Sequence, residues 1–326
     1  MHHPFNKNFN ILIIGDIMVD HYIHGFIAGE SQEASAKIVK WQDEYYKPGG
    51  AANVALNVQA LGSVPILAGC TGLDTEGKWL INEFKKSGLC TDLILADSTR
   101  RTTKKTRVLQ GHKHLIRLDR EDVHGIEQTQ AVTLLKKITN ILEELPIDTI
   151  VLQDYNKGVF TPFFIEHIIR ISTKYQVPFI VDPKFKNFYD FRKAKIFKPN
   201  KKEIDYALGK ILDQSELLHS SILDEMRERL QCQCLMVTLS DEGMIVNTNS
   251  YSRLQPAYPR LYVDGCGAGD TVLATLACLL PSGMDYWDIS FWANLSGGQV
   301  CEHSGVAVVN QNKLLEEHTQ ISKVAK

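Results

Sequence analysis

A glycine-rich turn with a single carboxylate is the part of the sequence best suited to chemistry. Residues 264–271 read DGCGAGDT, and the apolar run that follows predicts a helix beginning there. Free backbone N–H groups and the positive end of a helix dipole make such a turn a site for an anion. We expect the N–H groups of Gly267, Ala268 and Gly269 to hold a phosphoryl group. Asp270 would then take a proton from an acceptor hydroxyl as a general base.

Asp270 also has a plainer interpretation, in which it only caps the helix, as acids often do. The spacing of the glycines excludes two familiar nucleotide-binding loops. The chain has no GxxxxGK segment followed by Ser or Thr, and the turn reads GxGxGD, which lacks the third glycine of GxGxxG. The sequence therefore argues against a P-loop and against a dinucleotide-dependent oxidoreductase.

Short apolar strands alternate with segments of helix length along most of the chain. Strands are expected at ILIIGD (11–16), PILAGCTG (65–72), TIVLQD (149–154), PFIVDPK (178–184), IFKPN (196–200) and CLMVTLSDEGMIV (234–246). This rhythm is typical of an α/β fold with a mostly parallel central sheet and helices on both faces. The strand ends carry the polar residues Asp16, Asp154, Asp182, Asn200 and Thr238. Because ligands bind at that edge of such sheets, we expect the site there.

Two segments, residues 17–48 and 99–119, interrupt this rhythm. The first alternates loosely and is rich in aromatic residues, and the second has two β-rich arms around QGHK, which predicts a hairpin. We expect them to form a small β-sheet lid on a single domain that spans residues 1–326.

A second glycine segment, PGGAANVALNVQALG at 48–62, predicts a helix with glycines at its entry. Gly49 and Gly50 would let the backbone approach a ligand closely, and Asn53 would add an amide. The alternative is a helix start that merely needs a flexible entry.

The composition excludes several classes of protein. The 326 residues carry a formal net charge of −2 and 44% hydrophobic residues, so nothing indicates a nucleic-acid partner or an anionic membrane. Seven cysteines without a CxxC pair indicate reduced thiols in a cytoplasmic protein. The N-terminus has no apolar signal core, and no run is long enough to span a membrane.

The two glycine segments, in this order, resemble the two signatures of the ribokinase-like, or PfkB, sugar kinases. GDIMVD near the start, KPNKKE (198–203) and VTLSDEGM (237–244) match further motifs of that family, so the resemblance covers nearly the whole chain. It implies a ribokinase-like fold and transfer of a phosphoryl group from ATP with Mg²⁺, with Asp270 as the base.

The resemblance also implies roles for individual residues. Asp16 and Asp20 would bind sugar hydroxyls together with Gly49, Gly50 and Asn53. Asn200 and Glu203, one helical turn apart, would organise Mg²⁺ through water and the nucleotide phosphates. The remaining nucleotide contacts would come from a turn and from the adenine pocket, namely Thr238, Ser240, Gly243, Asn294 and Ser304.

Within the family, several stretches resemble the kinases that phosphorylate heptose 7-phosphate at O1 on the route to ADP-heptose. These are GDIMVDHY, SQEASAKIV, KTRVLQGHKHLIRLDRED, LQDYNKGVFTP and VDPKF. Three alternatives stay open: a kinase for another sugar phosphate, a kinase for a free sugar such as ribose or fructose, and a sugar or nucleotide sensor without catalysis.

A basic patch on the second lid segment would distinguish a phosphorylated sugar from a free one. Its members are Arg100, Arg101, Lys104, Lys105, Arg107 and Arg117. A substrate phosphate needs a few cations, preferably arginine forks. The stretch that resembles the heptose kinases favours Lys104, Arg107 and Arg117, and Lys157 and Lys184 are further candidates. The alternative is a solvated charged hairpin.

Two features depart from the heptose kinases. They usually carry SPEAPVP where this chain has SQEASAK, so the lid is expected to be looser or to accept another sugar. Bifunctional relatives also carry a nucleotidyltransferase domain with an HxGH motif, which this sequence lacks, so a separate protein is expected for that step.

The lid segments also contain an aromatic face, which predicts either a homodimer or packing against the sugar. Its members are Tyr22, Phe26, Trp41, Tyr45 and Tyr46.

Overall fold

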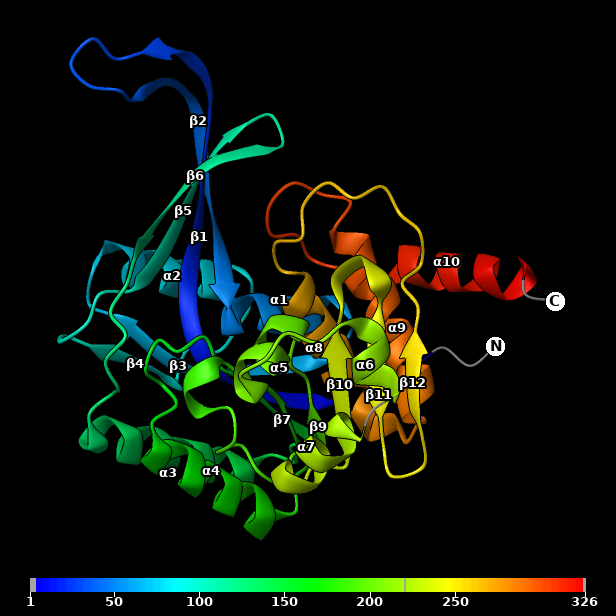
Figure 1. Ribbon diagram of the computed structural model, residues 1–326. Helices are drawn as coiled ribbons and strands as arrows, with labels where there is room; N and C mark the ends of the chain where they lie inside the picture. The colour runs from blue at the N-terminus through cyan, green and yellow to red at the C-terminus, as the bar shows by residue number, and fades with distance from the viewer. Residues whose placement is uncertain (1–3, 220, 325–326) are drawn as a thin grey trace.

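The computed structural model describes residues 4–219 and 221–324. A long central sheet runs through the molecule in the order β12-β11-β10-β9-β8-β7-β1-β3-β4 (Figure 1). Neighbours from β10 to β4 are parallel, and β11 and β12 add an antiparallel edge. The strands of this sheet are β1 (Asn10–Glu30), β3 (Val64–Gly72), β4 (Ile94–Asp97), β7 (Thr149–Gln153), β8 (Phe179–Asp182), β9 (Ile196–Phe197), β10 (Cys234–Thr238), β11 (Met244–Asn247) and β12 (Ser252–Gln255). The expected mostly parallel α/β sheet is confirmed.

Apolar side chains alternate between the two faces of the sheet and build one core on each. On β1, Ile11 and Ile13 belong to the first core, whereas Leu12 and Ile14 belong to the second. The first core is closed by α1 (Ala51–Ala60), α2 (Thr75–Lys86), α8 (Ala268–Leu279), α9 (Tyr286–Val300) and α10 (Gln311–Val324). The second is closed by α3 (Gln128–Glu144), α4 (Pro162–Tyr175), α5 (Lys201–Leu208), α6 (Gln214–His219) and α7 (Ile222–Leu230). The 3₁₀ turns are η1 (Phe185–Asn187), η2 (Ser240–Glu242) and η3 (Leu280–Ser282).

The lid grows out of the central sheet because β1 belongs to both. Its first half pairs with β3 and β7 up to Asp16, and from Ile17 onward it pairs with β2 (Lys37–Gly50). On its other side β1 pairs with β5 (Thr103–Gln110), which forms a hairpin with β6 (Lys113–Arg120). Figure 1 shows these strands rising above the body of the molecule. The expected β-sheet lid and the expected hairpin are confirmed.

The carboxyl ends of the central strands bring the expected polar residues to one edge. Gln153 ends β7, Asp182 ends β8, and an isolated bridge joins Asn200, just beyond β9, to Thr238 at the end of β10. The short strands β4 and β12 were not predicted, because four residues carry too little periodicity. No helix in residues 4–219 and 221–324 is long and apolar enough to span a membrane.

Candidate active site

The glycine turn places Asp270 in the first turn of α8. Gly267 precedes the helix with a φ of 81°, in the left-handed region that favours glycine. A β-carbon at this position would also lie only 2.9 Å from Asn53 Nδ2, so a larger residue would not fit. The N–H groups of Gly267 and Gly269 have no acceptor among the described residues, while that of Ala268 contacts the Gly265 carbonyl at 3.3 Å. Unused amides at a helix N-terminus favour an anion, in line with the expected phosphoryl site.

Three donors converge on the Asp270 carboxylate, which is 4% exposed. Asn53 Nδ2, from α1, donates to Oδ2 at 2.8 Å. Gln153 Nε2 and the Tyr155 hydroxyl donate to Oδ1 at 3.0 and 2.8 Å. Asp270 therefore faces the interior of the site and does not act as a cap, since no side-chain cap is formed at the start of α8.

Burial raises the pKa of Asp270 to about 7 from its ordinary value. The hydrogen bonds from Asn53 and Tyr155 oppose that rise, and the charges of Asp182 and Asp20 add to it. A carboxylate with a pKa near neutrality is suited to accept a proton from a hydroxyl, because it is deprotonated in part and yet basic. Asp270 thus has the properties of a general base.

Gln153 and Tyr155 were missed as site residues at the sequence level. Gln153 Nε2 also lies 3.3 Å from Asp182 Oδ2, so this amide joins two carboxylates at the sheet edge. The signal was available in the polar run QDYNKG at the end of β7. Its one acid, Asp154, and its lysine, Lys157, were singled out from the sequence because charged groups are the usual candidates for a site, whereas Gln153 and Tyr155 are uncharged donors.

Asp16 anchors the loop that follows β7. Its Oδ2 accepts the N–H groups of Tyr155 and Lys157 at 2.8 and 3.0 Å, and its Oδ1 accepts that of Val159 at 3.2 Å. The side chain expected to bind sugar hydroxyls is therefore already occupied by backbone amides. Its influence on the site passes through Tyr155, whose hydroxyl reaches Asp270.

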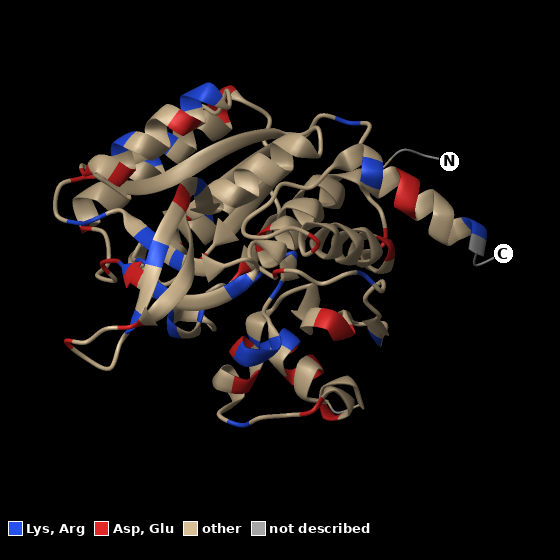
Figure 2. Ribbon diagram, turned by 90° about the horizontal axis from the view of Figure 1, so that it is seen from above, with Lys and Arg blue, Asp and Glu red and all other residues tan. Residues whose placement is uncertain are grey.

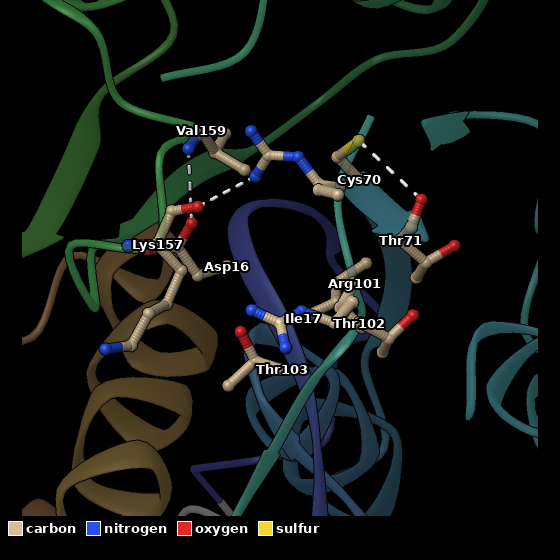
Figure 3. A pocket seen from close by; sticks show the side chains of 10 residues that line it. Asp16, Ile17, Cys70, Thr71, Arg101, Thr102, Thr103, Lys157 and Val159 are labelled. Carbon is tan, nitrogen blue, oxygen red and sulfur yellow. Dashed lines mark hydrogen bonds between the residues drawn. The ribbon is translucent and has the colours of Figure 1, made fainter. Parts of the chain in front are cut away.

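A small cavity beside Asp16 marks the junction between the central sheet and the lid (Figure 3). Its volume of about 10 Å³ suits a single water molecule and cannot hold a sugar. Arg100, one of its lining residues, donates to Asp97 and to the carbonyls of Lys157 and His124. Arg100 thus ties the lid to the loop after β7 and is not available to a substrate.

One face of the lid carries Asp20, Tyr22 and Arg107. Arg107 Nη1 pairs with Asp20, and its guanidinium lies over the Tyr22 ring, 5.3 Å from the centroid. Asp20 also fixes the glycine entry to α1, because a β-carbon on Gly49 would lie 2.0 Å from its Oδ2. Gly50, at a φ of 61°, completes this entry. The charge of Asp20, which was expected to bind the sugar, raises the pKa of Asp270, so the lid face and the expected base interact electrostatically.

The opposite face of the lid packs on α2, and Lys104 belongs to it. Successive side chains of a strand alternate between faces, so Lys104 is separated from Lys105 and Arg107. Lys104 Nζ contacts Glu76 Oε1 on α2 at 2.7 Å. Lys104, favoured from the sequence as a phosphate ligand, is therefore directed away from the Asp20 face, and Lys105 takes its place as a candidate.

Acids balance Lys105 and Arg117 on the lid and Lys157 in the loop after β7. Lys105 Nζ lies 3.4 Å from Asp119 and 3.7 Å from Glu121, and Lys157 Nζ lies 2.7 Å from Glu121. Arg117, whose side chain is 58% exposed, contacts Asp119 at 2.9 Å. Figure 2 shows the same interleaving of basic and acidic segments on the lid strands. The patch is thus a network of ion pairs and not a bare cationic surface.

Two lysines border the site from the sheet side. Lys184 Nζ pairs with Glu203 and lies 5.2 Å from the centroid of the Tyr155 ring. Lys198 Nζ contacts Asp182 Oδ2 at 3.0 Å and would lie 4.0 Å from a β-carbon on Gly269. Lys198 was not singled out from the sequence, although it precedes the Pro-Asn of KPNKKE.

Asn200 and Glu203 share a reciprocal cap at the start of α5. The Asn200 side chain accepts the Glu203 N–H at 2.9 Å, and Glu203 Oε2 accepts the Asn200 N–H at 2.7 Å. Burial raises the pKa of Glu203, the charge of Asp182 raises it further, and the Lys184 and Lys198 charges lower it. The pair expected to organise Mg²⁺ is therefore held in place by the helix itself.

The residues expected on the nucleotide side fall into two places. Thr238 forms a β-bridge with Asn200. Gly243 packs closely against the carbonyl of Gln255, since a β-carbon on Gly243 would lie 2.1 Å from its oxygen. Asn294 Nδ2 donates to the same carbonyl at 2.9 Å. Ser240 begins η2 with a φ of 57°. Ser304 lies instead beside Gly305, whose N–H donates to Asp264 and which packs against Tyr22. Ser304 is thus on the lid side of the site.

Residues 9–313 match the model of the pfkB family carbohydrate kinases. The chain belongs to the pfkB family of carbohydrate kinases. It is therefore an ATP-dependent phosphotransferase, and the family predicted from the two glycine segments is confirmed.

Solved structures of this pfkB fold superpose over almost the whole kinase. Phosphofructokinase-2 from Escherichia coli has a TM-score of 0.80 at 14% identity, covering 97% of this chain and 99% of that one. Arabidopsis thaliana ribokinase, complexed with ribose and ATP, has a TM-score of 0.73 at 16% identity, covering 95% and 98%. These similarities confirm the ribokinase-like fold.

Curated relatives of the pfkB kinase share about a third of its residues. The Bifunctional protein HldE of Nitratiruptor sp. is 34% identical over 313 residues, which cover 96% of this chain and 66% of that protein. The Bifunctional protein HldE of Helicobacter hepaticus is 32% identical, with coverages of 98% and 66%. The kinase thus spans just under two thirds of the length of these relatives.

Replacing Asp270 by Asn should remove the base and keep the shape of the side chain. We expect turnover to fall by about 100-fold or more, within the range that general bases contribute. ATP and sugar binding, measured by calorimetry, should be retained. Because the pKa of Asp270 in the unliganded protein is about 7, wild-type kcat/KM should rise with pH through about 7 and level off above it. An undiminished rate in the variant, or a flat wild-type profile across neutral pH, would contradict the assignment of Asp270 as base.

Proposed function

We propose that this kinase phosphorylates O1 of D-glycero-D-manno-heptose 7-phosphate to the 1,7-bisphosphate, with ATP as the donor, in the synthesis of ADP-heptose for lipopolysaccharide. The observation that carries the proposal is a group of three cations on one face of the lid, where Lys105, Arg107 and Arg117 lie on the same side as Asp20 and are held in place by acids. A phosphorylated sugar explains cations at this place better than a free sugar does. The relatives named HldE and the stretches that resemble heptose 7-phosphate kinases support this choice of sugar.

The chain supplies a base, an anion site and a cation for the transfer. The acceptor hydroxyl lies at Asp270, which takes its proton, and Asn53, Gln153 and Tyr155 hold the carboxylate in place. The amides of Gly267 and Gly269 hold the phosphoryl oxygens. Phosphoryl transfer needs little more than positioning and neutralisation of charge, and this arrangement provides both.

Lys184 is the cation that we assign to the transferred phosphoryl group. It is held between Glu203 and the Tyr155 ring, and Tyr155 in turn donates to Asp270. Burial alone would lower the pKa of Lys184, but the charges of Asp182 and Glu203 raise it overall. Lys184 therefore stays charged beside the base, where negative charge from the phosphoryl group would gather.

The acids at the sheet edge fit Mg²⁺ bound through water. Burial raises the pKa of Asp154 to about 7, and the negative charge of Asp16 raises it as well. The negative charge of Asp182 likewise raises the pKa of Glu203, so the two carboxylates repel each other. A divalent cation would relieve this repulsion, and Mg²⁺ keeps most of its waters, so direct ligation by Asn200 or Glu203 is not needed. When bound with ATP, the ion would neutralise charge on the phosphates. This chain's part is to present Asp182, Asn200 and Glu203 at that edge.

A homodimer through the lid is also part of the proposal. Several large apolar side chains of the lid strands are exposed, namely Phe26, Ile38, Trp41, Ile116 and Leu118. Apolar exposure of this kind is typical of an interaction surface. The lid strands β2 and β6 each have one neighbouring strand among the described residues, so each leaves an edge open for pairing.

The proposed substrate predicts a simple ranking of acceptors. Purified kinase with ATP and Mg²⁺ should release ADP fastest with heptose 7-phosphate, more slowly with other sugar phosphates such as fructose 6-phosphate, and least with ribose or fructose. The measurement is kcat/KM for each acceptor in a coupled ADP assay. Activity confined to unphosphorylated sugars would exclude a role for the lid cations, and binding without turnover would favour a sensor.

Lys105→Ala should weaken binding of the substrate phosphate, and Lys104→Ala is its matched control on the other face of the lid. Loss of a hydrogen bond between charged groups should raise KM for the sugar phosphate roughly tenfold or more, with KM for ATP unchanged. In Lys104→Ala, Glu76 keeps Arg120 as a partner, so the lid should stay folded. Equal effects of the two variants on KM would show that the faces were assigned wrongly.

Lys184→Met should lower kcat by roughly 100-fold or more, the effect of removing a group that stabilises transition-state charge. Because the single variant leaves Glu203 buried without its partner, Lys184→Met should also be combined with Glu203→Gln. Lys186→Met, an exposed lysine two residues along the chain, is the control. Variants that raise KM for ATP at unchanged kcat would instead assign Lys184 to nucleotide binding.

A further inference from the structure

The tip of the lid meets the glycine turn at a cluster of three different metal-ligating side chains. His114 lies at the start of β6, directly after the hairpin turn, while Asp264 and Cys266 flank Gly265 in the turn before α8. The ligand atoms of the three side chains all lie within 4.8 Å of one another. None of them has a part in the transfer of the phosphoryl group described above.

Asp264 holds the cluster together. Its Oδ2 lies 3.1 Å from His114 Nε2 and accepts the Gly305 N–H at 2.9 Å, and its Oδ1 accepts the Cys266 N–H at 3.0 Å. The Asp264 side chain is 9% exposed, whereas that of His114 is 39% exposed. The carboxylate is thus positioned by backbone donors, which is the support that metal ligands usually have, and the imidazole side remains open for an ion to enter.

The three ligand types together select one class of ion. An imidazole nitrogen, a carboxylate oxygen and a cysteine sulfur are the ligands of Zn²⁺ and similar transition metals, and three protein ligands leave the fourth position to water. Mg²⁺ prefers oxygen ligands and would not choose a thiol, so the cluster is chemically distinct from the edge that holds the acids. The incoming ion displaces the thiol proton to solvent, forming the metal–sulfur bond in its place.

We propose that His114, Asp264 and Cys266 bind one zinc-like divalent ion, which latches the lid onto the glycine turn. The ion joins β6 to the residue directly before Gly267, whose amide belongs to the anion site. It therefore fixes the lid tip and the turn to each other. Because the lid must open to exchange sugars, a bound ion lowers the rate of turnover. The contact between His114 Nε2 and Asp264 Oδ2 already joins the lid tip to the glycine turn at the place where the ion would bind.

Zinc affinity of the purified full chain tests the site without any assay of activity. The probe is Zn²⁺ in competition with a colorimetric chelator, compared for wild type, His114→Ala, His114→Gln and Cys266→Ser. Two variants serve as matched controls: His112→Ala, which removes the neighbouring exposed histidine of the hairpin turn, and Cys90→Ser, which removes an exposed cysteine elsewhere. Thermal unfolding of each variant without metal establishes that it is folded.

We expect one ion per chain in the wild type and in both controls. Loss of a residue that only supports a metal ligand lowers metal affinity by roughly 10- to 100-fold. Loss of one of the three ligands should therefore weaken zinc affinity by at least as much. With Co²⁺ as the probe, wild type should show a thiolate-to-metal absorption band that Cys266→Ser lacks. Hydrogen exchange in the hairpin tip should slow on addition of Zn²⁺ in the wild type and not in His114→Ala.

Equal zinc affinity in wild type, His114→Ala and Cys266→Ser would overturn the site, because binding would then be adventitious. Loss of binding in Cys266→Ser alone, with both His114 variants unchanged, would overturn the latch, since the lid would contribute no ligand. Loss of binding in Cys90→Ser or His112→Ala to the same extent would also overturn it, because the ion would then be held by exposed side chains outside the cluster.

Discussion

The site depends on holding one carboxylate away from water. Asp270 is buried at the end of the sheet, and a charge in that position is costly unless donors surround it. Asn53, Gln153 and Tyr155 supply those donors from α1, β7 and the loop after β7. Because burial wins over the hydrogen bonds, the folded state binds the proton more tightly than the unfolded chain does. This group therefore favours folding most at low pH, and its contribution is lost as the pH rises through about 7, so the raised pKa that the proposed base requires is obtained at the expense of stability.

The continuity of β1 connects this carboxylate to the lid. The strand leaves the central sheet at Asp16 and enters the lid at Ile17. At that junction Asp16 holds the backbone of the loop that carries Tyr155, and Tyr155 donates to Asp270. A displacement of the lid strand can therefore shift Tyr155, and with it the hydrogen bond to Asp270, through the single contact between Asp16 and the loop after β7.

Local spacing was enough to predict the glycine turn and Asp270, because a turn, a helix start and an acid lie within eight residues. It was also enough to predict the lid and the parallel sheet, which follow from alternation and from strand–helix rhythm. The partners of Asp270 could not be found in this way, since Asn53 and Gln153 reach it across 217 and 117 residues of chain. Because side chains of a strand alternate between its faces, the sequence predicts that Lys105 and Arg107 share one face of β5. The sequence does not show which face packs on α2, and it is this packing that directs Lys104 away from Asp20.

The balance of charge in the lid bears on how a phosphorylated substrate can be recognised. Lys105, Lys157 and Arg117 already have Asp119 or Glu121 as partners, so an arriving phosphate exchanges one anion for another and does not neutralise a bare cation. The affinity that a phosphate gains from each cation is then the difference between the new contact and the ion pair that it replaces, which is smaller than the affinity that a bare cation would give. What distinguishes substrates is whether the phosphate reaches these cations while the acceptor hydroxyl lies at Asp270. On the proposed function, a sugar of the wrong length would satisfy one end and leave the acids in place at the other, so the paired network would select substrates by their length.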